Sequence, residues 1–265
     1  MRLPTCYIPH GGGPWPFVDM RVGKKEEWDA LARYLRSLVT SLPARPQALL
    51  VVSAHWEEAK ATLMTAPRPS MLYDYGGFAP AAYELQWPAA TATSLVPRVR
   101  SLLEGAGIAC DEDAKRGFDH GTFVPMMLSV PDADIPVVQL SLYESLDAEA
   151  HLALGRALAP LRDEGVLIIG SGNSFHNLRA FGPQSGAPSQ QFDAWLGETV
   201  ARPRAERDER LRNWKAAPGG LHCHPREEHL LPLHVVAGAA GDDVGVVPFR
   251  GDIAGCRVSA VHFGG

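Results

Sequence analysis

Three histidines in this chain each follow a short apolar run. His10 follows residues 4–9, His55 follows residues 49–54, and His176 follows residues 166–175. Short runs of β-branched and other apolar residues, bounded by Gly, Pro or Ser, are typical of buried strands in an α/β sheet. Ligands of such sheets bind beyond the carboxyl ends of the strands. Because three imidazoles are brought to one edge, the pattern predicts a metal site.

Two further histidines lie where a turn or a helix is expected. His120 stands in the run Asp-His-Gly-Thr, and Thr122 is expected to cap a helix over residues 123–128. Pro225 suits the first position of another helix, so His229 is expected in the body of that helix. The His-Glu-x-x-His spacing of zinc peptidases is not present, which weakens a protease interpretation.

Small and polar residues surround two of the histidines. Three glycines follow His10 and allow both a sharp turn and the close approach of a ligand. Around His176, three polar side chains are expected to fix the tautomer of the imidazole: Asn173, Ser174 and Asn177.

The elements that must position these residues alternate between strands and helices. Helices are expected over residues 26–42, 94–103 and 148–161, and core strands over residues 49–53, 135–140 and 166–169. This alternation predicts a three-layer α/β/α fold with a mostly parallel central sheet. Two strand-like runs near the end, 244–249 and 257–263, are expected to add edge strands and make the sheet mixed. No linker or repeat divides the chain, so residues 1–265 are expected to form a single catalytic domain.

One long segment breaks the alternation. Residues 67–88 are rich in proline, glycine and aromatic residues. Ordered loops of this length in compact domains are usually functional.

The composition excludes several classes of protein. A chain of 265 residues that is 46% hydrophobic can bury a full core. Its net charge of −5 disfavours nucleic-acid partners, which need a basic face, and no apolar run reaches the roughly 20 residues of a membrane span. No signal peptide is recognisable and the four cysteines are scattered, so we expect a cytoplasmic protein with reduced thiols. A homodimer is the default expectation for its assembly.

Five ordered segments resemble the LigB-type class III extradiol ring-cleavage dioxygenases, and most closely their DOPA 4,5-dioxygenase branch. The resemblance extends over nearly the whole chain. The segments that carry it are His10-Gly-Gly-Gly-Pro14, Ser53-Ala-His-Trp56, Asp119-His-Gly121, Gly172-Asn-Ser-Phe-His-Asn177 and Glu227-Glu-His-Leu-Leu-Pro-Leu233.

The resemblance implies a role for each histidine. His10 and His55 match the two constant metal ligands of the family, and His229 matches a ligand from a late helix. His176 matches the acid/base histidine, which also becomes a fourth ligand when zinc is bound. His120 matches a histidine that contacts the substrate.

The same resemblance implies a cofactor and substrates. Fe(II) is the metal expected for activity, Zn²⁺ is an alternative bound ion, and the substrates are a small aromatic diol and O₂. Tyr73, Tyr75 and Phe78 are then expected to form a wall beside the flat ring. Two features depart from the family: His229 stands where well-studied members have a carboxylate, and three glycines follow His10 where Gly-Ser-Pro is common.

Two other functions use the same histidines. Imidazoles suit Zn²⁺ as well as Fe²⁺, so a zinc-dependent hydrolase that activates water is the rival enzyme. A non-catalytic protein that binds a metal or a small ligand on the same scaffold is the other alternative.

Overall fold

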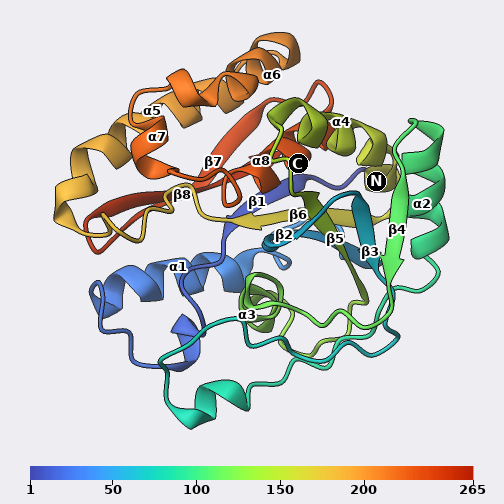
Figure 1. Ribbon diagram of the computed structural model, residues 1–265, viewed down its shortest axis with the longest axis horizontal. Coiled ribbons are helices and arrows are strands. Elements are labelled where there is room, and N and C mark those ends of the chain that lie inside the picture. Colours follow the sequence, from blue (N-terminus) through green and yellow to red (C-terminus); the bar gives the residue numbers. More distant parts are fainter. Residues whose placement is uncertain (265) are drawn as a thin grey trace.

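The computed structural model describes residues 1–264 and places eight strands in one sheet (Figure 1). The strands are β1 Thr5–Pro9, β2 Ala48–Glu58, β3 Ala61–Met64, β4 Cys110–Asp113, β5 Val137–Tyr143, β6 Val166–Gly172, β7 Gly245–Ile253 and β8 Cys256–Phe263. Their order in the sheet is β4-β3-β5-β2-β6-β1-β8-β7. The central pairs of β5, β2, β6 and β1 are parallel, and β8 joins β1 antiparallel. The predicted mixed, mostly parallel sheet is therefore confirmed.

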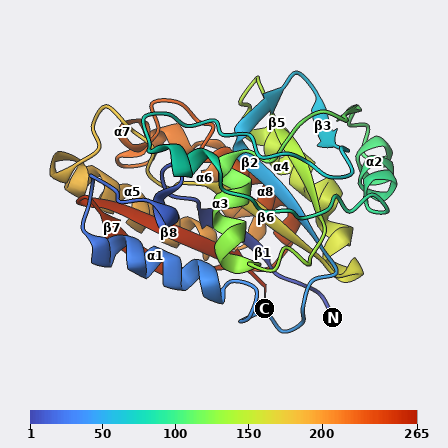
Figure 2. The same ribbon diagram turned by 90° about the horizontal axis from the view of Figure 1, so that it is seen from below.

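Helices cover both faces of this sheet. They are α1 Lys25–Ser37, α2 Val96–Gly105, α3 His120–Ser129, α4 Ala148–Leu158, α5 Gly186–Val200, α6 Arg204–Arg212, α7 Gly220–Cys223 and α8 Leu231–Ala240. Helices α1 and α3 lie on one face, whereas α4, α5 and α8 lie on the other (Figures 1 and 2). The arrangement confirms the three-layer α/β/α fold. Within residues 1–264, no helix combines the length and the apolar character that a membrane span requires.

The predicted elements differ from the observed ones mainly at their ends. The first helix ends at Ser37 rather than at residue 42. Just after Ser37, the hydroxyl groups of Thr40 and Ser41 donate hydrogen bonds to backbone carbonyls three residues earlier, which competes with helical bonding. The helix expected over 148–161 ends at Leu158, and Pro160 lies in the 3₁₀ turn that follows, because proline cannot donate the next helical hydrogen bond. Of the two late strands, β7 forms the edge and β8 lies between β7 and β1.

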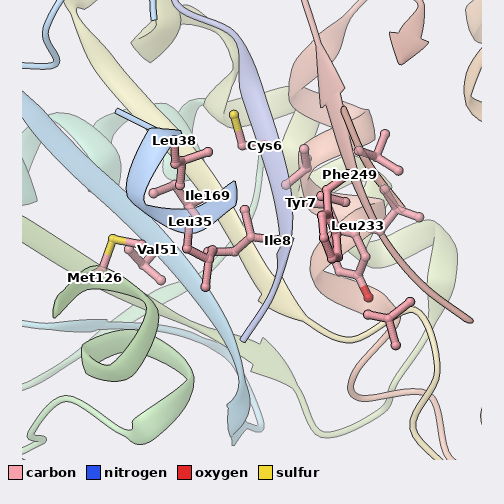
Figure 3. Packing of buried hydrophobic residues seen from close by; sticks show 14 of the residues in the cluster. Cys6, Tyr7, Ile8, Leu35, Leu38, Val51, Met126, Ile169, Leu233 and Phe249 are labelled. Atoms are coloured by element: carbon pink, nitrogen blue, oxygen red, sulfur yellow. The ribbon is translucent and has the colours of Figure 1, made fainter. Parts of the chain in front are cut away.

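Strand β1 packs against both helical layers. Its side chains alternate between the faces of the sheet, as a strand requires. Ile8 points toward Leu35 of α1, whereas Tyr7 points toward Leu233 of α8 (Figure 3). All five residues of β1 are buried, so the strand that ends beside His10 is held by packing on both sides.

Helix α8 is completely buried and packs unusually close to its neighbours. A Cβ atom at Gly170 of β6 would lie 2.4 Å from a carbonyl oxygen of α8, and one at Gly155 of α4 would lie 2.0 Å from another. Only glycine permits this approach of two backbones. At the carboxyl end of α8, Arg162 and Arg207 donate hydrogen bonds of 2.8–3.2 Å to the last carbonyl groups. These contacts fix the helix whose amino end carries His229.

Candidate metal centre and substrate cavity

His10 is the first residue after β1, and its tautomer follows from its surroundings. Its Nδ1 lies 3.0 Å from the Ser171 hydroxyl. That hydroxyl donates its proton to the carbonyl of Gly121, so it must accept a proton from His10 Nδ1. The proton of the neutral imidazole is therefore on Nδ1, and Nε2 presents a free lone pair.

His55 lies where the register of β2 is irregular, between Val52 and Glu57. Such irregularities re-aim side chains beside functional sites. The Nδ1 atom of His55 lies 3.5 Å from a carboxylate oxygen of Asp74, which favours a proton on that nitrogen. Its Nε2 lies 3.2 Å from Nε2 of His10. Two imidazole nitrogens thus meet directly.

His120 begins α3 and is held by Asp74. Its backbone N–H and its Nδ1 lie 2.9 and 2.8 Å from the same oxygen of Asp74. The helix is capped by Asp119, not by Thr122 as the sequence suggested, because the Asp119 carboxylate accepts from the N–H of Thr122. Asp119 also accepts from Ser53, at 2.6 Å.

His229 precedes α8 instead of lying within it. The helix expected from Pro225 begins only at Leu231. The carbonyl of His229 accepts hydrogen bonds from the Tyr7 hydroxyl, at 2.7 Å, and from the Asn173 N–H, at 3.2 Å. Its Nδ1 lies 2.9 Å from a carboxylate oxygen of Glu228, so Nε2 is again free.

His176 lies in the loop after β6 and stacks on His229, with ring centroids 3.3 Å apart and planes at 13°. Its Nδ1 lies 3.2 Å from Glu228. The carboxylate thus faces this nitrogen, whereas the amide of Asn173 exchanges two hydrogen bonds with the backbone of Gly11. The other two polar side chains expected beside His176 also bond elsewhere: Ser174 to the N–H of Ser259, and Asn177 to the carbonyl of His222.

The five histidines form one cluster. The ring of His10 lies 4.9 Å from that of His55, 5.4 Å from that of His120 and 5.1 Å from that of His229. The ligand atoms of His10, His55 and His120 all lie within 4.8 Å of one another, and those of His176, Glu228 and His229 form a second such group.

The environment keeps the imidazoles of His10, His55 and His229 neutral. Burial lowers the pKa of His10 well below its usual value, and the neighbouring imidazoles lower it further. Burial also lowers the pKa of His55 to about 4 and that of His229 well below normal, although Glu228 opposes the shift of His229. Burial acts to raise the pKa of Glu228, but hydrogen bonds from two histidines outweigh it and hold the pKa well below normal. The neutral form is the one that binds metals.

These residues fit a divalent transition metal. His10, His120 and His229 each have Nδ1 beside an oxygen atom, so their Nε2 lone pairs converge from separate elements. Two such lone pairs 3.2 Å apart repel each other unless a cation or a proton lies between them. Imidazole nitrogen suits both Fe²⁺ and Zn²⁺.

A cavity of about 500 Å³ opens beside the cluster. Its lining includes all five histidines, Asp74 and Asn173, the three glycines after His10, and several apolar side chains. Tyr73, Tyr75 and Phe78 are not among the lining residues. Tyr75 packs its ring 5.8 Å from that of His120, and a Cβ atom at Gly13 would lie 2.9 Å from the ring of Phe78, so both lie next to residues that line the cavity. The apolar wall comes instead from the segments around α1, β6, β7 and β8.

Sequence reasoning missed two carboxylates of the site. Asp74 comes from the long aromatic loop, and Glu228 directly precedes a histidine in the chain. The signal for Asp74 was weak: it is a single acidic residue between two tyrosines in a loop suspected of a function. The loop therefore contributes a partner for His55 and His120, and the substrate wall expected from Tyr73, Tyr75 and Phe78 stays a prediction.

Histidines outside the cluster have structural partners. His151 accepts a hydrogen bond at Nε2 from the N–H of Tyr143, and its Nδ1 lies 2.6 Å from the carbonyl of Asp147. Burial lowers its pKa to about 4. His234 of α8 contacts the carbonyl of Leu211 through Nε2. These side chains are used within the core and are not available as ligands at the cavity.

The comparisons with known proteins agree with this geometry. Residues 5–259 match the family model described as the catalytic LigB subunit of aromatic ring-opening dioxygenase. A 4,5-DOPA dioxygenase extradiol of Beta vulgaris is 39% identical over 90% of this chain and 87% of its own length. The dioxygenase tasH of Hapsidospora irregularis is 34% identical over 99% and 86%. A crystal structure of an uncharacterized Escherichia coli K12 protein aligns with a TM-score of 0.79 at 32% identity, covering 99% of this chain and 100% of that one.

The fold brings a histidine cluster to the carboxyl ends of the central strands, and the family model matches almost the whole chain. Together, these two findings define the class of protein as an aromatic ring-opening dioxygenase. The chain belongs to the family of the catalytic LigB subunit of these enzymes, and its relatives support an extradiol dioxygenase. The resemblance noted in the sequence is thereby confirmed.

Proposed function

We propose that the protein is a metal-dependent extradiol dioxygenase that opens a catechol ring with O₂. The observation that carries the proposal is the convergence of neutral imidazoles, with free Nε2 atoms, at one end of a largely apolar cavity. The relatives named for DOPA point to the same substrate class, a small aromatic diol. The histidines of the cluster come from β2, from the start of α3, from the segments after β1 and β6 and from the segment before α8, so we treat the whole chain as one catalytic domain.

The metal that we propose is Fe(II), held by His10, His55 and His229. When bound, it would supply the Lewis acidity and the redox chemistry that a reaction with O₂ needs. Of the two candidates for the third ligand, His120 groups more tightly with His10 and His55, whereas His229 matches the ligand position of the family. His176, which stacks on His229, is a fourth ligand if Zn²⁺ occupies the site.

The chain's own groups would handle the protons. We propose that Nε2 of His176 takes a proton from a catechol hydroxyl, because its Nδ1 faces Glu228, whose negative charge stabilises the resulting imidazolium. His120, fixed by Asp74, would hold a substrate oxygen through Nε2. The apolar wall would exclude water from the ring.

The test combines metal analysis with oxygen uptake. Protein purified without oxygen is reconstituted with Fe(II), given catechols and air, and examined for O₂ consumption and a yellow ring-opened product. We expect His10→Ala and His229→Ala to lose the metal. We expect His176→Ala to keep Fe(II) and lose most turnover, and His222→Ala, which alters a histidine outside the cavity lining, to serve as the control.

Four results would contradict the proposal. Full turnover by His176→Ala would show that His176 is not the base. Loss of metal from His120→Ala, but not from His229→Ala, would make His120 the third metal ligand and His229 the substrate contact. Ester hydrolysis by the zinc-loaded protein without oxygen uptake would favour the hydrolase, and tight metal binding without any turnover would favour a binding protein.

A further inference from the structure

Apart from the histidines, Asp74, Asn173 and the three glycines after His10, the lining of the cavity is apolar. Its apolar part includes side chains from the loop before α1, from α1 itself and from the segment after β6. Six of these lining residues are Met20, Val22, Trp28, Phe175, Leu178 and Phe181. A substituent on a ring bound at the histidines would therefore meet hydrocarbon and aromatic surface.

The lining offers no lysine or arginine to an anionic substituent. Among the described residues that line the cavity, none is lysine or arginine, and the one carboxylate is Asp74. Near His55, the guanidinium of Arg116 is already engaged, because it lies 3.1 Å from Asp119 and 3.0 Å from the carbonyl of His55. Apart from a metal ion held by the histidines, a carboxylate entering the cavity would face the carboxyl group of Asp74 and no lysine or arginine side chain.

The apolar surface continues to the exterior. Val22 and Leu178, which line the cavity, are 44% and 74% exposed and rank among the few large exposed hydrophobic residues. Arg179 follows Leu178 and is also exposed, but it does not line the cavity. Exposed apolar residues beside a pocket mark the place where an apolar ligand group contacts the protein.

We infer that the substrate is a catechol with an apolar, uncharged ring substituent, and that catechols carrying a carboxylate, including amino-acid catechols, are poorer substrates. The inference rests on the proposed function and specifies the substrate class of the same site. Burying one methylene group contributes about 0.8 kcal/mol, or about fourfold in kcat/KM. Burying an unpaired charge is unfavourable.

The experiment compares substituted catechols on the Fe(II)-loaded protein. Oxygen uptake gives kcat/KM for catechol and for its 4-methyl, 4-ethyl and 4-propyl derivatives, for 3-(3,4-dihydroxyphenyl)propionate, and for DOPA. We expect a rise of about fourfold per methylene group along the alkyl series. We expect the propionate, whose side chain has the same three carbon atoms as the propyl group, to be at least about tenfold poorer than 4-propylcatechol. Anaerobic calorimetry of the same pair measures binding without turnover and should give the same order.

Variants at the mouth test the role of charge. Leu178→Lys should improve kcat/KM for the propionate up to about fivefold, as an exposed ion pair allows, and Leu178→Met is the matched control that keeps the surface apolar. Arg179→Ala should leave the preference unchanged.

The outcomes separate this inference from the proposed function. Equal or better cleavage of the carboxylates, or a loss of propionate turnover in Arg179→Ala, would overturn the inference and leave the ring-cleavage proposal intact. Failure of the metal-loaded protein to cleave any catechol would overturn the proposed function, and the inference with it.

Discussion

Replacing Gly172 with alanine tests whether contact with the sheet positions His229. A Cβ atom at Gly172 would lie 2.1 Å from the carbonyl oxygen of His229 and 3.0 Å from the ring of Tyr7. Contacts below 3.0 Å are essentially never observed, so the carbonyl must retreat by about 0.9 Å. Overpacking of this kind costs about 1–3 kcal/mol. A ligand displaced this far also exceeds the tolerance of roughly 0.2 Å that metal–ligand distances allow.

We therefore expect Gly172→Ala to lower both stability and metal affinity. Urea unfolding of the metal-free protein measures the packing cost, and titration with zinc against a competing chelator measures the affinity, which should fall at least about tenfold. Gly105→Ala is the matched control, because a Cβ atom at this helix end meets nothing within 4 Å. If Gly172→Ala bound zinc within a factor of two of the unaltered protein, the reasoning that the sheet sets the ligand position would be refuted.

Three further predictions concern the partners of the site and the core. Asp74→Asn should weaken metal binding or turnover by about 10–100-fold, because it removes the anion beside His55 and His120; unchanged calorimetric affinity and oxygen uptake would contradict this. Arg162→Met should cost about 3 kcal/mol or more in urea unfolding, because it leaves buried carbonyls at the end of α8 without donors; a loss below about 1 kcal/mol would disprove that role. His151 has its pKa lowered to about 4, so the unfolded chain takes up the proton first as the pH falls below about 6.5, and stability declines until about pH 4. Urea unfolding should show about 2 kcal/mol of this loss at pH 5 relative to pH 8, and His151→Gln should lose correspondingly less; an equal loss in both proteins would refute the assignment.

Much of the architecture follows from the sequence alone. Apolar runs with helical or strand-like spacing report which faces of an element are buried, and they gave the central strands, the layer order and the mixed sheet. Since parallel strands end at one edge, the positions of His10, His55 and His176 after such runs were enough to predict that they meet. Element ends were less accurate: the helix expected at Pro225 begins at Leu231, because a periodic pattern does not fix the turn that precedes it.

Only the tertiary structure decided what surrounds these histidines. Asp74 is 46 residues away from its partner His120, and nothing local to either residue indicates the pairing. The same holds for the contact between Gly172 and the carbonyl of His229, which places the candidate ligand. Tautomer, burial and pKa are properties of the folded environment, and the cavity wall is assembled from segments that are separated in the chain. The sequence therefore determined which chemical groups reach the edge of the sheet, and the packing of distant segments determined their protonation, their orientation and the character of the space they face.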